Sequence, residues 1–401
     1  MSNTICPLLY ITTFGEILIH HELISQINHT GYNRSTSPLK LIQASSDSEA
    51  LSAFLHEYRD SPKTLRVYAK EIERLLLWCL HVHQLSLTEL TREHITEYQT
   101  FLMNPQPATL WCGPKVARYK KDESINPDWK PFFKALTDTS IKKAFKILDS
   151  FFNYLVEMRY LQGNPIAMNR RRKRKSPIAA RLVERYLEMD ELIAVLNALD
   201  DYPQPDAQHK FRIVRARYII LLLFYSGMRI AESANHTMGN FIQRDRCWFL
   251  SIIGKGKKPR DIPVPDELLL ALASFRQSIG LISKEPAFKE TTPLIPSINL
   301  KHTLHVRRID QIVKWAFSLG ANAIESRSPH KASKLRQASA HWLRHSYVTY
   351  LLDSGASLKV AQENAGHSNI STTMLYRHVS QTNRHSETRR LSIPEHDTTK
   401  Q

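Results

Sequence analysis

Six consecutive basic residues interrupt this chain of 401 residues and separate two regions of regular apolar patterning. They are Arg170, Arg171, Arg172, Lys173, Arg174 and Lys175. Because like charges repel, such a run is extended rather than packed in a core. The sequence therefore predicts two domains joined by a basic linker over residues 169–185, and the chain is long enough for each domain to have its own core. Taken alone, the run could be a segment that contacts a polyanion, a solvated linker or a nuclear localisation signal.

The region before the linker, residues 48–168, predicts a bundle of four amphipathic helices. Apolar residues recur at helical spacing over residues 51–58, 65–79, 95–102 and 141–155. Gly163-Asn164-Pro165 is a stop signal after the last of these helices. The patterning of residues 1–47 is weak, so this N-terminal extension is given no role.

A proline-rich segment, residues 104–138, separates the third and fourth predicted helices. It contains five prolines together with Trp111 and Trp129. A connection of this length either has a function of its own or is an insertion packed on the bundle. We favour the packed insertion.

The region after the linker, residues 186–380, predicts a mainly helical domain with a small β element, so the fold class is α+β. A helix begins at Asp190, and residues 218–225 predict a buried helix. Residues 247–253 and 261–264 predict two short strands joined by a turn at Gly254-Lys255-Gly256-Lys257. Helical patterns at 309–317, 341–352 and 358–365 follow, then a short helix opening at Ser371 and a tail at 381–401.

The charge balance favours a polyanionic partner. The chain has 55 Lys and Arg against 38 Asp and Glu, a formal net charge of +17. DNA is the commonest such partner, because each phosphate that a cation neutralises releases condensed counterions. RNA and membrane surfaces are also anionic, and a basic composition can serve solubility alone.

Cysteine usage and apolar runs indicate the compartment. The four cysteines lie far apart in the sequence, which argues against a zinc ribbon and against a disulfide framework. The N-terminus lacks a cationic segment before its apolar residues, so no signal peptide is expected. The longest apolar run is far below membrane-spanning length. We expect a soluble, cytoplasmic protein with no membrane partner.

Two motifs of the second region contain a cation suited to binding phosphate. Arg229 follows Gly227 at the end of the buried helix, where a glycine lets backbone approach closely and an arginine presents a planar fork of donors. Lys255 lies in the turn between the two strands, where a lysine can donate a proton to a phosphate ester oxygen. Each has a plain alternative, since Arg229 can pair with Glu232 and turn lysines are mostly solvated.

Two later motifs add imidazoles, a second arginine and a tyrosine. His341 and Arg344 are three residues apart, so they share one helix face. His367 and Tyr376 follow within a short distance along the chain. The alternatives are metal binding by His341 and His345, core histidines bonded to backbone carbonyls, and a tyrosine that only packs.

The order and spacing of these motifs resemble the tyrosine recombinase (phage integrase) family, most closely its bacterial Xer-like and integrative-element members. The family's pattern is Arg, Lys, His-x-x-Arg, His and Tyr, which this chain matches in order with Arg229, Lys255, His341, Arg344, His367 and Tyr376. The resemblance covers residues 47–379, by helical pattern in the first half and by motif in the second. It departs from the family at residues 364–365, where relatives carry leucines, and lysines 257 and 258 rival Lys255.

The resemblance implies a fold and a reaction. The fold would be a helical core-binding domain at 48–168, a catalytic domain at 186–380 and a tail at 381–401. The reaction would be site-specific cleavage and rejoining of double-stranded DNA through a 3′-phosphotyrosyl intermediate on Tyr376, with no metal, cofactor or ATP.

The family's roles carry over residue by residue. Arg229 and Arg344 would clamp the scissile phosphate, and His367 would hydrogen-bond it. Lys255 would protonate the leaving 5′ oxygen, and His341 would act as general base on the tyrosine. The two domains would clamp DNA with the basic linker along its backbone, and a homotetramer would join two DNA sites, with accessory directionality factors as further partners.

Three other functions remain open on the sequence. A type IB topoisomerase uses the same tyrosine chemistry, although the glycine-flanked arginine and the helical first domain favour the recombinase. A non-catalytic DNA-binding protein could retain the fold, although all six positions are present. A metal-dependent nuclease would need a carboxylate cluster, which the motifs lack.

Overall fold

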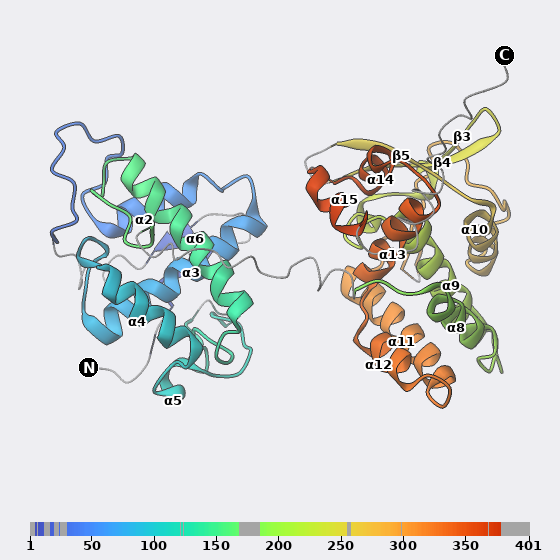
Figure 1. Cartoon of the computed structure of the whole chain (residues 1–401), viewed down its shortest axis with the longest axis horizontal. Helices are drawn as coiled ribbons and strands as arrows, with labels where there is room; N and C mark the ends of the chain where they lie inside the picture. The colour runs from blue at the N-terminus through green and yellow to red at the C-terminus, as the bar shows by residue number, and fades with distance from the viewer. Residues whose placement is uncertain are drawn as a thin grey trace, which may run out of the picture. The chain divides into compact units, whose positions relative to one another are not determined.

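The structure is a computed structural model of the chain that describes residues 5, 7–11, 17–19, 24, 30–120, 122, 124–167, 185–254, 258–297, 299–367 and 369–377. It divides into two compact units, Met1–Lys175 and Ser176–Gln401 (Figure 1). The division falls within the predicted basic linker, whose six cations lie outside the described residues. The expected class, mainly α with a small sheet, is confirmed.

The four helices predicted for the N-terminal unit are all present. They are α2 (Asp47–His56), α3 (Pro62–Trp78), α4 (Arg92–Met103) and α6 (Asp138–Glu157). Three of them begin at a residue whose hydroxyl accepts a hydrogen bond from the first turn, namely Ser46, Thr91 and Thr137. A π-helical turn (Cys79–His83) extends α3, and a 3-10 turn (Leu87–Glu89) precedes α4.

The proline-rich segment between α4 and α6 packs on this bundle. It contains the one-turn helix α5 (Ala108–Trp111), and Trp111 is only 1% exposed. The Trp111 ring lies 4.8 Å from the ring of Phe101 on α4. Arg74 of α3 places its guanidinium over Phe132 and donates to the carbonyl of Pro131 at 3.0 Å. These contacts anchor the segment at both ends, as expected for an insertion that adds to the core.

Part of the N-terminal extension is tied to the same bundle. Strands β1 (Leu9–Ile11) and β2 (Ile17–Ile19) pair antiparallel. The backbone N–H groups of Leu8 and Leu9 both donate to the buried carboxylate of Glu73 on α3, each at 3.0 Å. Glu73 therefore satisfies the backbone donors at the first residue of β1 and at the residue before it.

The C-terminal unit is built around α9 (Ala207–Ser226), whose residues 218–224 are all buried. It packs against α8 (Met189–Asp200), α10 (Asp266–Ser278), α11 (Val306–Ile324) and α13 (Ala340–Asp353). The apolar stretch 218–224 is buried because these neighbouring helices surround the second half of α9. The described residues contain no helix both long and apolar enough to cross a membrane.

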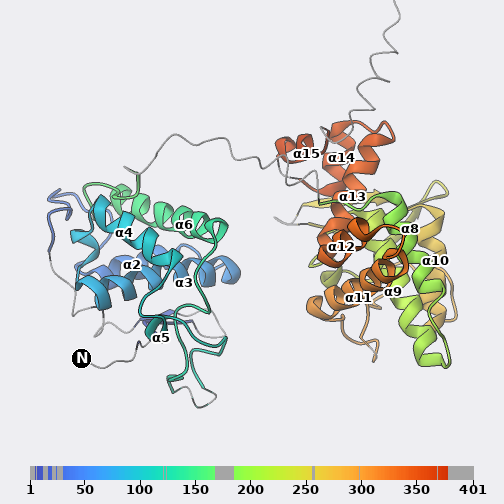
Figure 2. The same cartoon turned by 60° about the horizontal axis from the view of Figure 1, so that its bottom comes forward.

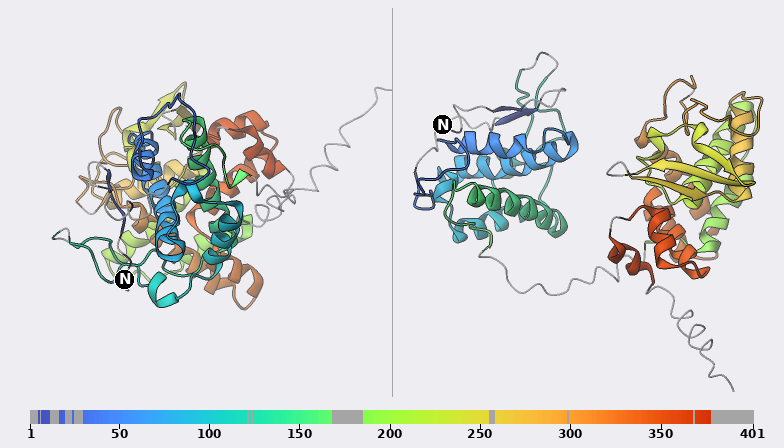
Figure 3. Two further views of the ribbon diagram at one scale, coloured as in Figure 1. Left: turned by 90° about the vertical axis from the view of Figure 1, so that its left-hand side faces the viewer. Right: turned by 90° about the horizontal axis from the view of Figure 1, so that it is seen from above.

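A three-stranded antiparallel sheet lies along one side of this unit (Figure 3). Its strands are β3 (Phe241–Arg244), β4 (Cys247–Ile253) and β5 (Pro259–Pro263), in that order. Strands β4 and β5 are the predicted pair, whereas β3, α10 and α12 (Pro329–Gln337) were not expected from the sequence.

Three helices complete the unit at one end (Figure 2). Helix α13 contacts both α14 (Leu358–Ala365) and α15 (Ile370–Arg377), and α14 also contacts β5. The helix expected to open at Ser371 begins one residue earlier, and the N–H of Ser371 donates to the Asn369 side chain at 2.9 Å. This end of the unit therefore gathers the ends of α9 and α14, strand β5, and helices α13 and α15.

Candidate active site

The motifs singled out in the sequence converge on this end of the C-terminal unit. Arg229 lies just past the end of α9, His341 and Arg344 lie on α13, His367 follows α14, and Tyr376 lies on α15. Lys255 belongs to the connection between β4 and β5 and lies outside the described residues. The other five predicted side chains thus come from four separate segments to one region.

Gly227 makes the junction between α9 and α13 possible. It ends α9 in the left-handed conformation, with φ of 54°. A Cβ at this position would lie 2.2 Å from the Tyr347 ring of α13. The carbonyl oxygen of Gly227 accepts a hydrogen bond from Nη1 of Arg344 at 2.6 Å. A glycine is required here both by the backbone conformation and by the closeness of α13.

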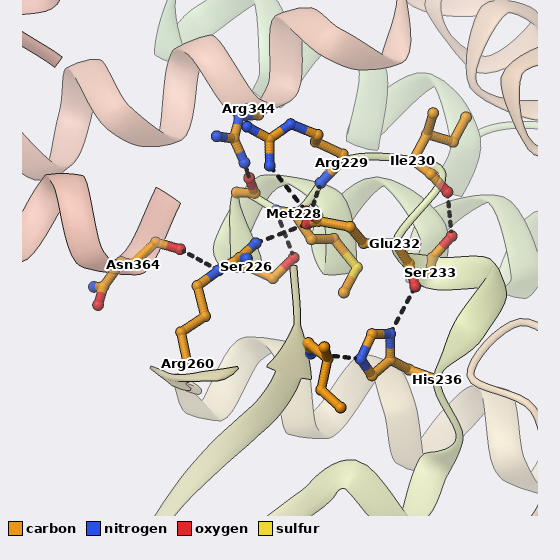
Figure 4. Close-up of polar contacts among 12 residues, drawn as sticks. Ser226, Met228, Arg229, Ile230, Glu232, Ser233, His236, Arg260, Arg344 and Asn364 are labelled. Carbon is orange, nitrogen blue, oxygen red and sulfur yellow. Dashed lines mark hydrogen bonds and ion pairs between the residues drawn. The ribbon is translucent and has the colours of Figure 1, made fainter. Parts of the chain in front are cut away.

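Glu232 joins two arginines from different elements (Figure 4). Its carboxylate pairs with Nη1 of Arg229 at 2.9 Å and with Nη2 of Arg260 at 2.7 Å. It also accepts the backbone N–H of Arg229 at 2.9 Å. Burial opposes ionisation of Glu232, but the hydrogen bonds from Arg260 and Arg229 outweigh it and lower the pKa of the carboxyl. The sequence had offered pairing with Glu232 as an alternative to phosphate binding for Arg229. The structure contains this pair, and the pair is part of the candidate site.

Arg260 is a residue of this site that the sequence motifs did not reveal. It lies on β5 and donates from Nε to the backbone carbonyl of Asn364 on α14 at 3.0 Å. A Cβ on Gly366 would lie 2.6 Å from its guanidinium, so this glycine gives it room. Arg260 could have been found from the sequence, because it lies five residues beyond Lys255 on the strand that follows the turn.

Arg344 is buried and keeps one of its donor atoms without a partner. The residue is 2% exposed, and its Nη2 atom has no hydrogen-bond partner among the residues that the structure describes. Burial and the nearby Arg229 charge lower its pKa to about 10, although Glu232 acts in the opposite direction. A buried donor of this kind is costly unless an anion binds it. The site is therefore prepared for a negatively charged ligand.

The hydroxyl of Tyr376 is held by a histidine that was not assigned a role. Tyr376 is 6% exposed, and its hydroxyl is hydrogen-bonded to Nδ1 of His345, which is also 6% exposed. His341, the expected general base, is exposed, and its ring lies 4.4 Å from the His345 ring in an edge-on arrangement. The sequence had suggested only metal binding or a place in the core for His345, and no contact with the tyrosine.

His367 contacts the ring of the same tyrosine. Its ring is stacked on the Tyr376 ring, with centroids 6.2 Å apart and an interplanar angle of 9°. Its Nδ1 atom is hydrogen-bonded to the hydroxyl of Thr373 at 2.9 Å. In the neutral tautomer in which Nδ1 accepts the hydroxyl hydrogen, the ring carries its proton on Nε2, which can then donate to a ligand.

Burial and positive neighbours keep the imidazoles of the site neutral. Desolvation, then the charges of neighbouring His and Arg side chains, lowers the pKa of His345 to about 3 and that of His367 to about 4. The pKa of His341 is lowered by partial desolvation and by Arg344 and Arg229. Burial raises the pKa of Tyr376 to about 12, and Arg344 opposes this rise. The resting site thus contains neutral imidazoles, a protonated phenol and charged guanidinium groups.

The described ranges contain no group of three or more His, Cys, Asp and Glu side chains placed to hold a metal ion.

At the turn that carries Lys255, the N–H of Gly254 donates to the carbonyl of Lys258 at 2.9 Å. This bond closes the β4–β5 hairpin beside Arg260, and Lys258 itself is exposed.

Comparisons with known proteins point to one family. The phage integrase family matches residues 185–383 of this chain. A tyrosine recombinase of Thermosipho africanus is 29% identical over 265 residues, which are 63% of this chain and 79% of that protein. The tyrosine recombinase XerD of Staphylococcus aureus is 28% identical over 241 residues, or 60% of this chain and 72% of that protein.

Solved structures share the fold. The site-specific recombinase XerH, bound to a palindromic difH substrate after cleavage, aligns with a TM-score of 0.55 at 18% identity, over 87% of this chain and 85% of that one. The Tn1549 transposon integrase in complex with transposon right-end DNA aligns with a TM-score of 0.56 at 14% identity, over 86% of this chain and 99% of that one.

Proposed function

This chain belongs to the phage integrase family of tyrosine recombinases, and we propose that it is a site-specific DNA recombinase that uses Tyr376 as its nucleophile. The observation that carries the assignment of the site is the buried, unpartnered Nη2 of Arg344 beside Arg229, in the same region as the Tyr376 hydroxyl. A DNA phosphodiester is an anion that two guanidinium groups can bind with paired, charge-assisted hydrogen bonds.

The reaction needs a group that attacks the phosphate and a group that leaves it. The Tyr376 oxygen bonds to phosphorus while the bond from phosphorus to the 5′ oxygen breaks, which produces a 3′-phosphotyrosyl ester and a 5′ hydroxyl. Rejoining reverses both bonds, with the 5′ hydroxyl of a partner strand as nucleophile. Since the ester conserves the bond, the reaction requires no ATP.

The five described residues fit complementary roles in that reaction. Arg229 and Arg344 stabilise the negative charge that builds on the phosphorus centre, where preorganised donors contribute most. His367 donates from Nε2 to the phosphate, consistent with its Nδ1 bond to Thr373. His341 assists removal of the tyrosine proton, and Lys255 protonates the 5′ oxygen, both by analogy with the family.

A covalent adduct tests this function directly. Duplexes taken from the DNA that flanks the gene, nicked so that the cleaved fragment diffuses away, should trap a denaturant-resistant protein–DNA adduct. Tyr376→Phe should abolish the adduct and leave DNA binding intact. An adduct formed by the Phe variant would show that another residue is the nucleophile.

Further arms of the same assay separate the alternatives. A recombinase exchanges strands between two DNA partners, whereas a type IB topoisomerase relaxes one supercoiled plasmid. A non-catalytic DNA-binding protein gives no adduct with any duplex that it binds. Adduct formation in excess chelator would exclude a metal-dependent nuclease.

We also propose that the basic residues 170–175 contact DNA phosphates and that the active form is a tetramer that joins two DNA sites. Family resemblance supports the tetramer, and the charge of the run supports the contact. Accessory directionality factors are a further proposal of the same kind. Sizing of the free protein and its DNA complex tests the assembly, since one protein per site throughout exchange would contradict the tetramer.

A further inference from the structure

The Tyr376 hydroxyl has one hydrogen-bond partner, the His345 side chain, among the residues that the structure describes. His345 lies one residue beyond Arg344 and four beyond His341 on α13, so one turn of this helix carries the phosphate clamp and the tyrosine's partner. The ring centroids of His345 and Tyr376 are 5.4 Å apart. Both side chains are buried, so water does not compete for the bond.

We infer that His345 is a catalytic residue that positions Tyr376 through Nδ1 and takes its proton as the bond to phosphorus forms. The inference deepens the proposed recombinase function and rests on it. It reassigns the first proton acceptor from His341 to the neighbouring His345, one helical turn further along α13. Nδ1 is an acceptor only in the neutral imidazole with its proton on Nε2, and that tautomer is the one able to receive the phenolic proton.

The electrostatics of the site couple this proton transfer to substrate. The charged and titratable groups that face His345 are His341 and Arg344 on α13, His367 after α14, Arg185 before α8, and the phenol itself on α15. Before DNA binds, desolvation and these positive neighbours hold the pKa of His345 at about 3. A bound phosphodiester adds a negative charge between the arginines. This charge offsets their repulsion and makes the imidazolium easier to form.

The step balances in both directions. In cleavage, the phenolic proton moves to Nδ1 of His345 while the tyrosine oxygen bonds to phosphorus and the 5′ oxygen departs with a proton from the general acid. In rejoining, the tyrosine–phosphorus bond breaks and His345 returns the proton to the phenolic oxygen. The acceptor therefore acts as a donor on the reverse path, and the nucleophile is never free as a phenolate in a positive pocket.

The discriminating variant is His345→Asn. An asparagine places an amide oxygen close to the position of Nδ1, so it can accept the tyrosine's hydrogen bond but cannot accept its proton. We expect the single-turnover rate of adduct formation on saturating nicked DNA to fall by about 10²-fold or more near neutral pH. The deficit should shrink by about tenfold for each pH unit above neutrality, because hydroxide replaces the missing base.

Three controls make the result specific. His330→Asn is the same substitution at an exposed position on α12 and should leave the rate unchanged. DNA affinity and cooperative thermal unfolding should match the wild type, and His345→Gln, closer in size to histidine, replaces the Asn variant if that variant does not fold. His341→Asn should retain the wild-type shape of the pH–rate profile.

The possible results distinguish failure of the proposed function from failure of the inference about His345. If the wild-type protein forms no adduct, the proposed function is wrong. If the wild type forms the adduct and His345→Asn cleaves at the wild-type rate with the wild-type pH profile, the inference about His345 is wrong while the function stands. A steep pH dependence in His341→Asn instead of His345→Asn would likewise overturn it and return the base to His341.

Discussion

Arg344 donates a hydrogen bond to the carbonyl oxygen of Gly227 at 2.6 Å, and this bond ties the turn after α9 to the middle of the site. One guanidinium nitrogen is thereby used to fix the side chain, while Nη2 is left without a partner among the described residues. The donor that fixes Arg344 and the donor that can bind an anion therefore belong to the same rigid plane. Rigid placement of this kind is what electrostatic catalysis requires.

Replacing Gly227 with alanine should disrupt this junction. The substitution forces a left-handed residue to carry a Cβ that would lie 2.2 Å from the Tyr347 ring. Backbone strain and the clash together should lower the free energy of unfolding by about 2–4 kcal/mol and reduce adduct formation. The matched control is Gly280→Ala, where φ is 82° but no atom lies within 4 Å of the added Cβ. Chemical denaturation of both variants checks this, and equal losses of stability would contradict a role for the Tyr347 ring.

Glu232 should contribute stability that disappears in acid. Its pKa in the folded protein lies below the ordinary value of 4.5, because hydrogen bonds from Arg260 and Arg229 outweigh the opposing effect of burial. The contribution is present above the unfolded pKa and is lost as pH falls through the lower, folded one. Glu232→Gln should therefore be less stable than the wild type at neutral pH, with the gap narrowing below about pH 4.5. A constant gap from pH 7 to pH 3 would contradict this assignment.

As pH is lowered, the buried histidines should begin to reduce the free energy of unfolding at a higher pH than Glu232 does. The folded pKa values of about 3 for His345 and about 4 for His367 lie below the ordinary value of 6.5. Between those values the unfolded chain binds more protons, so stability is fully present above about pH 6.5 and decreases as pH falls. His367→Asn removes one such group, and its thermal midpoint should depend less on pH between about 6.5 and 4. An unchanged slope would show that His367 titrates normally in the folded protein.

The lysine of the β4–β5 turn can be identified by changing the leaving atom. A substrate with sulfur in place of the bridging 5′ oxygen releases a thiolate, which needs far less help from a general acid because thiols are much stronger acids than alcohols. Lysines 255, 257 and 258 would each be replaced by alanine. We expect Lys255→Ala to lose about 10²-fold or more in rate on the oxygen substrate and to be largely restored on the sulfur substrate. Restoration of the Lys257 or Lys258 variant instead would move the role to that residue.

Neutralising the basic run should weaken DNA binding and its salt dependence together. Each cation that binds a phosphate contributes about 0.9 to the slope of log K against log salt concentration. Replacing Arg171, Arg172 and Lys173 with glutamine should lower affinity uniformly across DNA sequences and reduce this slope by about one for each phosphate that is no longer neutralised. If the slope stays unchanged in the linker variant, the basic run is solvated and does not contact DNA phosphates.

Local patterning was sufficient to predict most helices and the residue types of the site. Helices α2, α3, α4 and α6 follow from apolar spacing, because an amphipathic stripe is a property of neighbouring residues along one segment. Among the elements missed, α12 is polar over most of its length and β3 is only four residues long. The arginines, histidines and tyrosine of the motifs were identifiable because their order along the chain is itself informative.

The partners of those side chains could not be read from the chain, because they depend on packing between distant segments. Arg260 meets Asn364 across 104 positions, and His345 meets Tyr376 across 31. No periodicity relates such pairs, since helix packing and strand placement set the distance between them only after the core has formed. The sequence therefore specified which chemical groups the site contains, whereas the packing of α13 against α9, α14 and α15 decided that His345 holds the tyrosine and that one nitrogen of Arg344 stays available for an anion.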